Sequence, residues 1–304
     1  MSLELTKALQ TAAGEENVLV NEPMSLHTTF RIGGPADYFV SPGDEESLRE
    51  VIRICRETQT PFTLIGNGSN LLVGDGGYRG VVICLARTMS EIRVEGDTIT
   101  AEAGAMLSSV AREAYNASLT GLEFAAGIPG TLGGGVIMNA GAYGGELKQV
   151  IESVRLMTAE GEIVTRSCEE MEFGYRTSRA MKDGSYILSA TIKLEKGDQS
   201  SIKEIMDDLK DRRVSKQPLD LPSAGSTFKR PEGYFAGKLI MDSGLAGFTV
   251  GGAQVSEKHC GFVVNRGGAT AKDVRSLMQQ VEERVLADYG VTLEPEVRFL
   301  GEFE

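Results

Sequence analysis

Two glycine-rich stretches contain the clearest signs of ligand chemistry in this sequence. The first, "IGNGSNLLV" (65–73), places Gly66 and Gly68 between two short apolar runs. Glycine lets a backbone approach a ligand closely, and free N–H groups in such a loop, with the donors of Ser69 and Asn70, can surround a phosphate. A plain tight turn explains the same residues, and the stretch is neither a Rossmann fingerprint nor a Walker motif. Taken alone, it leaves both interpretations open.

The second stretch, "GIPGTLGGGVIMNAGAYGG" (127–145), shifts the balance toward a ligand. It contains the consecutive glycines Gly133, Gly134 and Gly135 beside an apolar segment. Glycine loses more backbone entropy on folding than any other residue, so a run of glycines indicates a backbone packed directly against a ligand. Two such loops in one chain indicate a dinucleotide with a pyrophosphate.

The stretch "FGYRTSR" (173–179) contains groups that could hold an anion. Arg176 follows Tyr175 there, and Arg179 is close. Arginine is suited to bidentate recognition of a carboxylate. A surface arginine beside a half-buried tyrosine explains the same spacing.

Two later stretches contain groups that could move a proton or balance a charge. In "PSAGSTFKRP" (222–231), Ser226 has no obvious histidine partner, so it is a poor nucleophile, although a well-placed hydroxyl could deliver a proton. A hydroxyl that caps a turn is the plainer interpretation. In "LEPEVRFLG" (293–301), Glu296 and Arg298 could equally form an exposed ion pair.

Overall charge and residue usage exclude several classes of protein. The formal net charge is -12 and the pI is about 4.9, which argues against a nucleic-acid-binding surface. No apolar run approaches the roughly 18 residues of a membrane span, and the first residues lack the layout of a signal peptide. The two histidines and four scattered cysteines suggest no metal site. We therefore expect a cytoplasmic protein without a membrane segment.

The elements that must position these groups are a mixture of helices and hairpins. Apolar spacing predicts helices over 44–58, 106–117, 201–215 and 270–290. Hairpins are expected to turn at Gly96-Asp97 and at Glu160-Gly161. Further strands are predicted over 62–65, 71–73, 80–85, 185–195, 251–256, 260–265 and 291–300. This mixture favours an α+β fold over a doubly wound parallel sheet.

Two details of the elements affect the expected sites. Ile202, Ile205, Met206 and Leu209 are expected to form one apolar face of the helix over 201–215. In the final strand, alternation places Thr292, Glu294, Glu296 and Arg298 on one face. The prolines that follow Ser215 indicate a domain border.

The combination of motifs resembles the UDP-N-acetylenolpyruvoylglucosamine reductase family over about residues 20–300. The resemblance is carried, in order, by "TTFRIGGPADYFV", "IGNGSNLLV", "GIPGTLGGGVIMNAGAYGGE", "YRTS", "AGSTFKRP", "AGKLI" and "GFVVN". It implies a two-part FAD-binding module of the vanillyl-alcohol oxidase type (PCMH type), over 1–90 and 91–215. A smaller α+β substrate-binding domain follows over 216–304. The short chain resembles the family's shorter structural class.

The resemblance also implies a reaction and its catalytic residues. NADPH reduces non-covalently bound FAD, and hydride then passes to C3 of UDP-N-acetylglucosamine enolpyruvate. Protonation at C2 gives UDP-N-acetylmuramate, a peptidoglycan precursor. Ser226 matches the family's proton donor, and Arg176 and Glu296 match the pair that polarises the substrate carboxylate.

Binding residues follow from the same resemblance. Contacts with FAD are implied for Arg31 and for residues of both glycine-rich loops, namely Ile65, Gly66, Asn67, Gly68, Ser69, Asn70, Leu71, Gly127, Ile128, Pro129, Gly130, Thr131, Gly133, Gly134, Asn139, Ala140 and Gly141. Contacts with the substrate are implied for Tyr175, Lys216, Lys229, Arg230 and Lys238. Some family members have asparagine at the position of Arg230.

Two other functions remain as alternatives. A different flavin oxidoreductase on the same scaffold would explain the glycine-rich loops, but not the joint presence of Arg176, Ser226 and Glu296. A sugar-nucleotide-binding regulator without catalysis would not need these three residues. We expect a monomer that acts on small molecules, with no nucleic-acid, membrane or metal partner.

Overall fold

The computed structural model of the protein describes residues 2–86 and 88–303. The chain forms two units, each assembled from three separate segments. Unit 1 comprises Met1–Leu19, Phe39–Asn67 and Val82–Arg213. Unit 2 comprises Val20–Tyr38, Gly68–Val81 and Val214–Glu304.

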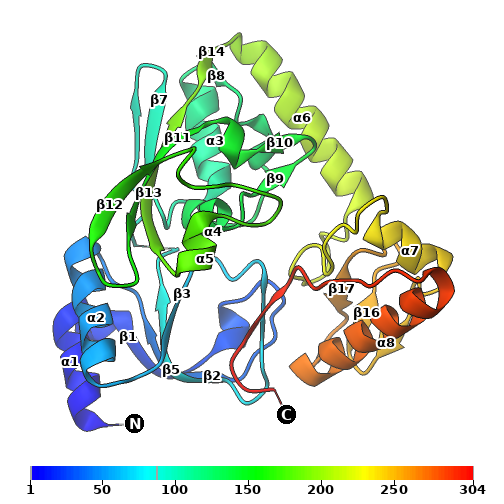
Figure 1. The fold of residues 1–304 in the computed structure, drawn as a ribbon, viewed down its shortest axis with the longest axis horizontal. Coiled ribbons are helices and arrows are strands. Elements are labelled where there is room, and N and C mark those ends of the chain that lie inside the picture. Colours follow the sequence, from blue (N-terminus) through cyan, green and yellow to red (C-terminus); the bar gives the residue numbers. More distant parts are fainter. Residues whose placement is uncertain (1, 87, 304) are drawn as a thin grey trace. The chain divides into compact units, whose positions relative to one another are not determined.

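A five-stranded antiparallel sheet forms the centre of unit 1, in the order β12-β11-β13-β7-β6 (Figure 1). Its strands are β6 (Ile92–Glu95), β7 (Thr98–Glu102), β11 (Ile151–Met157), β12 (Ile163–Ser167) and β13 (Tyr186–Lys193). Both predicted hairpins are confirmed, because β6 pairs with β7 and β11 pairs with β12 around the expected turns. The sheet carries the segments between its strands that contain the second glycine-rich loop and Arg176.

Five helices accompany this sheet, namely α1 (Leu3–Ala13), α2 (Glu45–Glu57), α3 (Leu107–Asn116), α4 (Leu132–Ile137) and α5 (Arg179–Asp183). Helices α3 and α4 contact its strands, α5 contacts α4, and α1 packs against α2. Helix α2 matches its prediction: Asp44 caps it through the Ser47 N–H, and its apolar stripe is buried at Leu48, Val51, Ile52 and Cys55. Helix α4 packs against β13, which fixes the glycine run on the sheet (Figure 1).

Further strands and short helices complete the chain. A four-stranded sheet has the order β1-β2-β5-β3, with β1 (Val18–Pro23), β2 (Pro35–Val40), β3 (Phe62–Ile65) and β5 (Tyr78–Cys84). Two-stranded pairs join β8 (Leu119–Thr120) to β14 (Glu195–Lys196) and β9 (Gly141–Ala142) to β10 (Gly145–Glu146). Short 3-10 helices cover Glu15–Asn17, Met24–Leu26, Glu123–Ala125 and Leu147–Gln149.

Unit 2 combines a small sheet with two helices. Strands β15 (Thr249–Val250), β16 (Ala253–Val255) and β17 (Val263–Asn265) form an antiparallel sheet that packs on α8 (Ala271–Tyr289), which in turn contacts α7 (Ala236–Asp242). Helix α8 has the predicted capping box at Thr270 and ends at Gly290, whose φ is 67°. Strand β18 (Arg298–Leu300) pairs in parallel with β4 (Leu71–Val73).

The core of unit 2 draws on all three of its segments. Phe30, Ile32 and Leu72 are buried in one cluster with Phe228 and Val281. The first two segments of the unit are therefore part of its interior. The three-domain division at 1–90, 91–215 and 216–304 stays a prediction.

Two expectations about elements need correction. Helix α6 (Gln199–Lys216) exists, but of its expected apolar face only Ile202 is buried, and the Ile205 side chain is 46% exposed. The strand expected over 291–300 is also shorter, since only Arg298–Leu300 is regular. Pro295 has no N–H for a ladder and forms an isolated bridge with Phe228, and a bend at Val297 interrupts the expected alternation.

Candidate active site

The two glycine-rich loops lie against each other within unit 1. A Cβ built on Gly66 would lie 2.1 Å from Thr131 Oγ1, so any larger residue at this position would have to displace the Thr131 side chain. The Asn67 side chain donates a hydrogen bond to the carbonyl oxygen of Pro129 at 2.7 Å. The fold therefore brings together two stretches that the sequence assigns to one cofactor.

The three consecutive glycines have different surroundings. A Cβ on Gly133 would lie 2.9 Å from the Ala103 Cβ, and one on Gly135 would lie 2.9 Å from Leu107 Cδ1. Close packing inside the protein therefore explains these two, whereas the sequence suggested a ligand for the whole run. Gly134 is exposed, and its nearest neighbour to a Cβ would be Thr131 Oγ1 at 3.7 Å. The protein itself therefore leaves room for a Cβ at position 134, and close packing does not explain the glycine there.

The buried side chain of Asn139 hydrogen-bonds to two segments, residues 146–148 and the turn at Gly174. Asn139 is 1% exposed and has a φ of 44°. Its Nδ2 donates to Glu146 Oε2 at 3.0 Å and to the carbonyl oxygen of Gly174 at 3.1 Å, while its Oδ1 accepts the Lys148 N–H at 3.0 Å. Because both ends of the amide are used inside the protein, only the backbone of Asn139 is left for a cofactor.

Arg176 lies at the tip of a tight turn that Asn139 holds. Gly174 and Thr177 pair with each other, which leaves Tyr175 and Arg176 as the two turn residues. Arg176 has a left-handed φ of 55°, and its guanidinium lies 5.2 Å from the centre of the Tyr175 ring. A hydrogen bond from Lys148 holds the pKa of Glu146 below its ordinary value, and the charge of Arg176 contributes to that shift.

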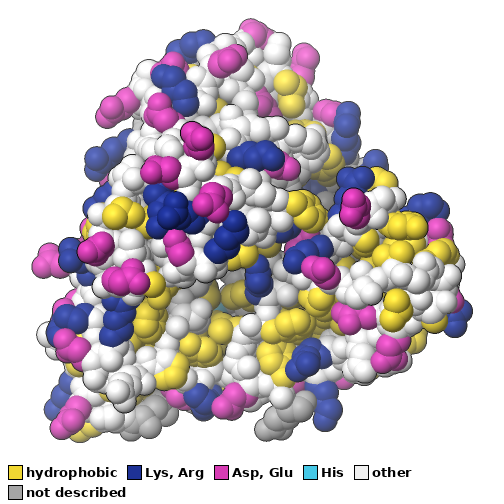
Figure 2. All heavy atoms as spheres, viewed as in Figure 1, with side chains coloured by type: hydrophobic (Ala, Val, Ile, Leu, Met, Phe, Trp, Pro, Cys, Tyr) yellow, Lys and Arg dark blue, Asp and Glu magenta, His cyan; other side chains and the backbone are white. Residues whose placement is uncertain are grey.

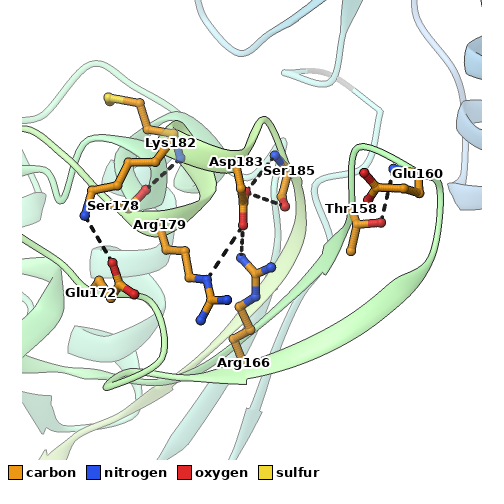
Figure 3. A network of polar contacts seen from close by, with 10 residues as sticks. Thr158, Glu160, Arg166, Glu172, Ser178, Arg179, Lys182, Asp183 and Ser185 are labelled. Carbon is orange, nitrogen blue, oxygen red and sulfur yellow. Dashed lines mark hydrogen bonds and ion pairs between the residues drawn. The ribbon is translucent and has the colours of Figure 1, made fainter.

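The segment after this turn is anchored by a polar network on α5 (Figure 3). The Ser178 hydroxyl is fully buried, donates to the carbonyl oxygen of Ile137 at 2.8 Å, and caps α5. Asp183 receives hydrogen bonds from Arg166 at 2.7 Å and from the Ser185 hydroxyl at 2.6 Å. Burial acts to raise the pKa of Asp183, but these hydrogen bonds outweigh it, and the pKa is lowered. The turn that presents Arg176 is thus fixed from both sides.

In unit 2, Ser226 lies between Gly225, which has a left-handed backbone conformation, and Thr227, which is held by hydrogen bonds. Gly225 has a φ of 76°, which favours glycine, and Ser226 itself is exposed. Thr227 is 1% exposed, donates its N–H to Gly261 at 2.8 Å, and accepts the Val263 N–H on Oγ1 at 2.9 Å. The hydroxyl of Ser226 is therefore presented on the surface of unit 2 by a backbone held one residue away.

Glu296 is joined to the same segment. Its N–H donates to the carbonyl oxygen of Thr227 at 2.8 Å. Its own carbonyl oxygen accepts from Asn70 Nδ2 at 3.1 Å, and Asn70 in turn accepts the Arg298 N–H at 2.9 Å. Three stretches that are distant in sequence, each with predicted site residues, thus meet within unit 2.

The segment that contains Arg31 also packs near the serine loop. The Thr29 hydroxyl donates to the carbonyl oxygen of Ser223 at 2.7 Å. Gly68 lies so close to this segment that a Cβ would be 2.1 Å from the carbonyl oxygen of His27. Arg31 is exposed and has a φ of 55°. The segment of residues 27–31, which contains Arg31, therefore lies directly against Gly68 of the first glycine-rich loop.

The cations expected to bind the substrate are exposed or lightly paired. Lys229 forms an ion pair with Glu294 at 3.0 Å, and Lys238 forms one with Asp242 at 2.7 Å, which raises the pKa of Lys238. The guanidinium of Arg230 lies 4.0 Å from the centre of the Phe235 ring. Exposed pairs of this kind contribute little to stability, so these side chains can exchange partners for an anion.

Two exposed aromatic residues beside Arg230 were not predicted from the sequence. Tyr234 and Phe235 are 46% and 58% exposed, and Arg230 donates through Nε to the Tyr234 carbonyl at 3.4 Å. The sequence signal that could have indicated them is the pair Tyr234-Phe235, which closely follows Lys229 and Arg230.

The described residues offer no alternative metal chemistry. They contain no cluster of His, Cys, Asp or Glu able to hold a metal ion, and their cysteines are free thiols. Among them, no helix is both long enough and apolar enough to cross a membrane. On the face that Figure 2 shows, Lys and Arg are interspersed with Asp and Glu.

The predicted site residues are divided between the units. Unit 1 contains Ile65, Gly66, Asn67, Gly127, Ile128, Pro129, Gly130, Thr131, Gly133, Gly134, Asn139, Ala140, Gly141, Tyr175 and Arg176. Unit 2 contains Arg31, Gly68, Ser69, Asn70, Leu71, Lys216, Ser226, Lys229, Arg230, Lys238 and Glu296.

Two protein-family models match different parts of the chain. A model described as an FAD binding domain matches residues 36–167. A model described as the C-terminal domain of UDP-N-acetylenolpyruvoylglucosamine reductase matches residues 217–300. The exposed Gly134 and the joined loops of unit 1 fit a flavin dinucleotide.

Individual relatives are similar over almost the whole chain. A UDP-N-acetylenolpyruvoylglucosamine reductase from Clostridioides difficile is 54% identical over 288 residues, covering 95% of each chain. One from Clostridium perfringens is 52% identical over 299 residues, covering 98% of each. The crystal structure of the enzyme of this name from Thermus caldophilus has a TM-score of 0.80 at 35% identity, covering 93% of this chain and 98% of that one.

A more distant structure supports the fold alone. An alkyldihydroxyacetonephosphate synthase has a TM-score of 0.50 at 15% identity, covering 64% of this chain and 41% of the other. The predicted α+β fold, an FAD-binding module followed by a smaller domain, is confirmed by these similarities.

Proposed function

This chain belongs to the UDP-N-acetylenolpyruvoylglucosamine reductase family, and we propose on that premise that it reduces UDP-N-acetylglucosamine enolpyruvate to UDP-N-acetylmuramate with NADPH. The product is a precursor of peptidoglycan. The observation that carries the proposal is the convergence of Ser226, Glu296 and Asn70 on one backbone network in unit 2. We further propose that the protein acts as a monomer in the cytoplasm.

FAD is the cofactor that the chain would hold. When bound, FAD supplies the hydride, which it takes from NADPH and delivers to C3 of the enolpyruvyl group. Gly134 supports this role, since its exposed backbone leaves room for a flat or phosphorylated ligand. The contacts from Gly66, Asn67 and residues 127–131 would hold the cofactor without a covalent bond.

Ser226 would donate the proton to C2 of the substrate. Its hydroxyl is exposed, while the adjacent Thr227 is fixed by hydrogen bonds on N–H, carbonyl and hydroxyl. A serine has a pKa far above neutral, so it is a weak acid at working pH. The carbon left after hydride addition is strongly basic, and this basicity lets a positioned hydroxyl serve.

Arg176 and Glu296 would act on the substrate carboxylate. Arg176, presented by the 174–177 turn, would stabilise the negative charge that develops there, as an oxyanion-hole donor does. Glu296 would hold the geometry next to the proton donor, to whose segment its own N–H is bonded. Tyr175, Lys216, Lys229, Arg230 and Lys238 would bind the nucleotide diphosphate.

Stopped-flow flavin absorbance tests the assignment of Ser226. In Ser226→Ala, we expect NADPH to reduce the flavin at the normal rate. Reoxidation by UDP-N-acetylglucosamine enolpyruvate should slow by about 10²- to 10⁴-fold, the range for loss of a general acid. Ser223→Ala is the matched control, because it removes a hydroxyl from the same segment but leaves the carbonyl that Thr29 contacts. Normal reoxidation in Ser226→Ala would remove this residue from the mechanism.

A further inference from the structure

Arg213 lies against the second glycine-rich loop of unit 1. It is near the C-terminal end of α6, and its side chain occupies the space that a side chain at Gly127 would need. A Cβ on Gly127 would lie 3.1 Å from Arg213 Cδ and 3.3 Å from Nη1. Glycine at position 127 therefore lets the guanidinium rest directly on the loop backbone.

The charge on Arg213 has no visible counter-charge. Among the described residues, none forms an ion pair or hydrogen bond with its guanidinium, although the group is half-buried. Burial lowers the pKa of Arg213, and the nearby phenol of Tyr143 acts in the opposite direction. Its neighbour Arg212 is exposed and ion-paired with Asp208 at 2.8 Å. A buried cation without a partner is costly, and arginine stays protonated, so a bound anion is its expected partner.

The surroundings of Arg213 suit an anion with a planar or nucleotide portion. Gly127 is exposed, and the next residues lead to Pro129, whose carbonyl is fixed by Asn67. Tyr143 is 43% exposed and lies at the tip of the β9–β10 turn, where its φ is 54°. Arg213 thus contacts the open backbone at Gly127, and the exposed ring of Tyr143 is near enough to influence the pKa of Arg213.

We infer that Arg213 binds a phosphate group of a nucleotide held at the 127–131 loop. This inference rests on the proposed function, which supplies three phosphate-bearing nucleotides: FAD, NADPH and the UDP-sugar. The guanidinium would donate paired hydrogen bonds to phosphate oxygens, a geometry that lysine cannot reproduce. Neither the family motifs nor the sequence spacing pointed to this residue.

The test compares Arg213→Met with Arg212→Met in the purified holoenzyme. Methionine keeps much of the apolar length and removes the charge at each site. We expect Arg213→Met to weaken one nucleotide by about 10- to 100-fold, as for loss of a charged hydrogen bond. Arg212→Met should behave as wild type, since its arginine lies on the exposed side of the same helix.

Three measurements identify the source of the phosphate. A contact with FAD predicts a lower ratio of flavin to protein absorbance and weaker FAD rebinding. A contact with the 2′-phosphate predicts a higher KM for NADPH but not for NADH. A contact with the UDP-sugar predicts a higher KM for the enolpyruvyl substrate alone. If Arg213→Met equals Arg212→Met in all three, Arg213 does not bind phosphate.

A second variant keeps the inference testable if Arg213→Met does not fold. Arg213→Lys retains the charge and should show a smaller loss for the same nucleotide at an unchanged melting temperature. Wild-type behaviour of Arg213→Lys, together with unaltered nucleotide binding in Gly127→Ala, would overturn the inference. Weaker FAD binding in a protein whose wild type does not reduce the enolpyruvyl substrate would instead support the phosphate site and count against the proposed function.

Discussion

Gly133 and Gly134 are neighbours, yet the absence of a side chain serves different purposes at the two positions. At Gly133 the space is filled by Ala103, whose Cβ would lie 2.9 Å from an added methyl group. At Gly134 the nearest atom would be 3.7 Å away, so the protein itself has room for a methyl group. Stability and cofactor binding should therefore separate between these two residues.

We predict that Gly133→Ala impairs stability, whereas Gly134→Ala impairs flavin binding. Gly133→Ala should lower the free energy of unfolding by about 1–3 kcal/mol, because the core there is overpacked. Gly134→Ala should leave stability within about 0.5 kcal/mol of wild type but reduce the flavin content of the purified protein. Urea unfolding of the FAD-free protein and flavin absorbance measure the two effects. A Gly134→Ala protein with full flavin content would show that the cofactor does not approach this backbone.

His259 makes the stability of the protein depend on pH. Its Nδ1 accepts the Gly261 N–H at 3.1 Å, and burial lowers its pKa below the ordinary value of about 6.5. The unfolded chain therefore binds a proton near pH 6.5 that the folded chain resists. Neutral His259 therefore costs the folded state nothing above about pH 6.5. As the pH falls below this value, the free energy of unfolding decreases by at most about 1.4 kcal/mol per pH unit because of this residue.

The variant His259→Asn tests this pH dependence. Its amide oxygen can still accept the Gly261 N–H, but it does not titrate. Urea unfolding between pH 7.5 and 5.5 should show a smaller loss of stability in the variant than in wild type. Equal losses would assign the pH dependence to other groups.

At the scale of elements, the network around Asn139 connects the glycine-rich segment to the turn that bears Arg176. One amide contacts Glu146, Lys148 and Gly174. Removing it should loosen that turn without touching any residue that would meet the substrate. Asn139 is therefore a positioning residue in our interpretation.

We predict that Asn139→Ala slows flavin reoxidation by the enolpyruvyl substrate more than flavin reduction by NADPH. Asn139→Asp should be at least as damaging, since its carboxylate would face Glu146 and could not donate to Gly174. Stopped-flow absorbance separates the two half-reactions. Asn116→Ala, on the exposed surface of α3, is the control. An equal slowing of both half-reactions would point to general loosening of the fold instead.

The sequence predicted elements best where local signals agree. Helix α8 has its capping box, apolar stripe and terminal glycine, and its bounds were predicted closely. The final strand was predicted too long, because alternation alone ignores what residues 294–296 bond to. They pair irregularly with 227–229, a contact across more than sixty residues that no local pattern contains. The same limit concealed Arg213, whose contact with Gly127 exists only in the folded chain.

At the scale of the whole molecule, the units are not continuous in sequence. Residues 214–304 share their core with Phe30, Ile32 and Leu72, and β18 pairs with β4. Domain borders inferred from the sequence divide the chain into consecutive stretches. They could not predict that Val20–Tyr38 and Gly68–Val81 would fold together with Val214–Glu304. The motifs themselves were predictable, because each is local.

We predict that a fragment of residues 214–304 does not fold cooperatively. It lacks Phe30, Ile32 and Leu72, and burying three large apolar side chains is worth about 1.5–3 kcal/mol each. Thermal unfolding followed by circular dichroism should show a broad, shallow change in the fragment and a sharp transition in the full chain. A sharp transition in the fragment would mean that the early segments are dispensable for this core.

The assembly of unit 2 from three separate segments affects how the chain folds during its synthesis. Phe30, Ile32 and Leu72 leave the ribosome early, but their partners in the core extend to Val297. At about 5–20 residues per second, translation of the intervening chain takes roughly 10–45 s. During that interval the core is incomplete, because the later partners of these three side chains begin at Ala224 and extend to Val297. The exposed apolar surface makes slow translation a risk for aggregation of the nascent chain.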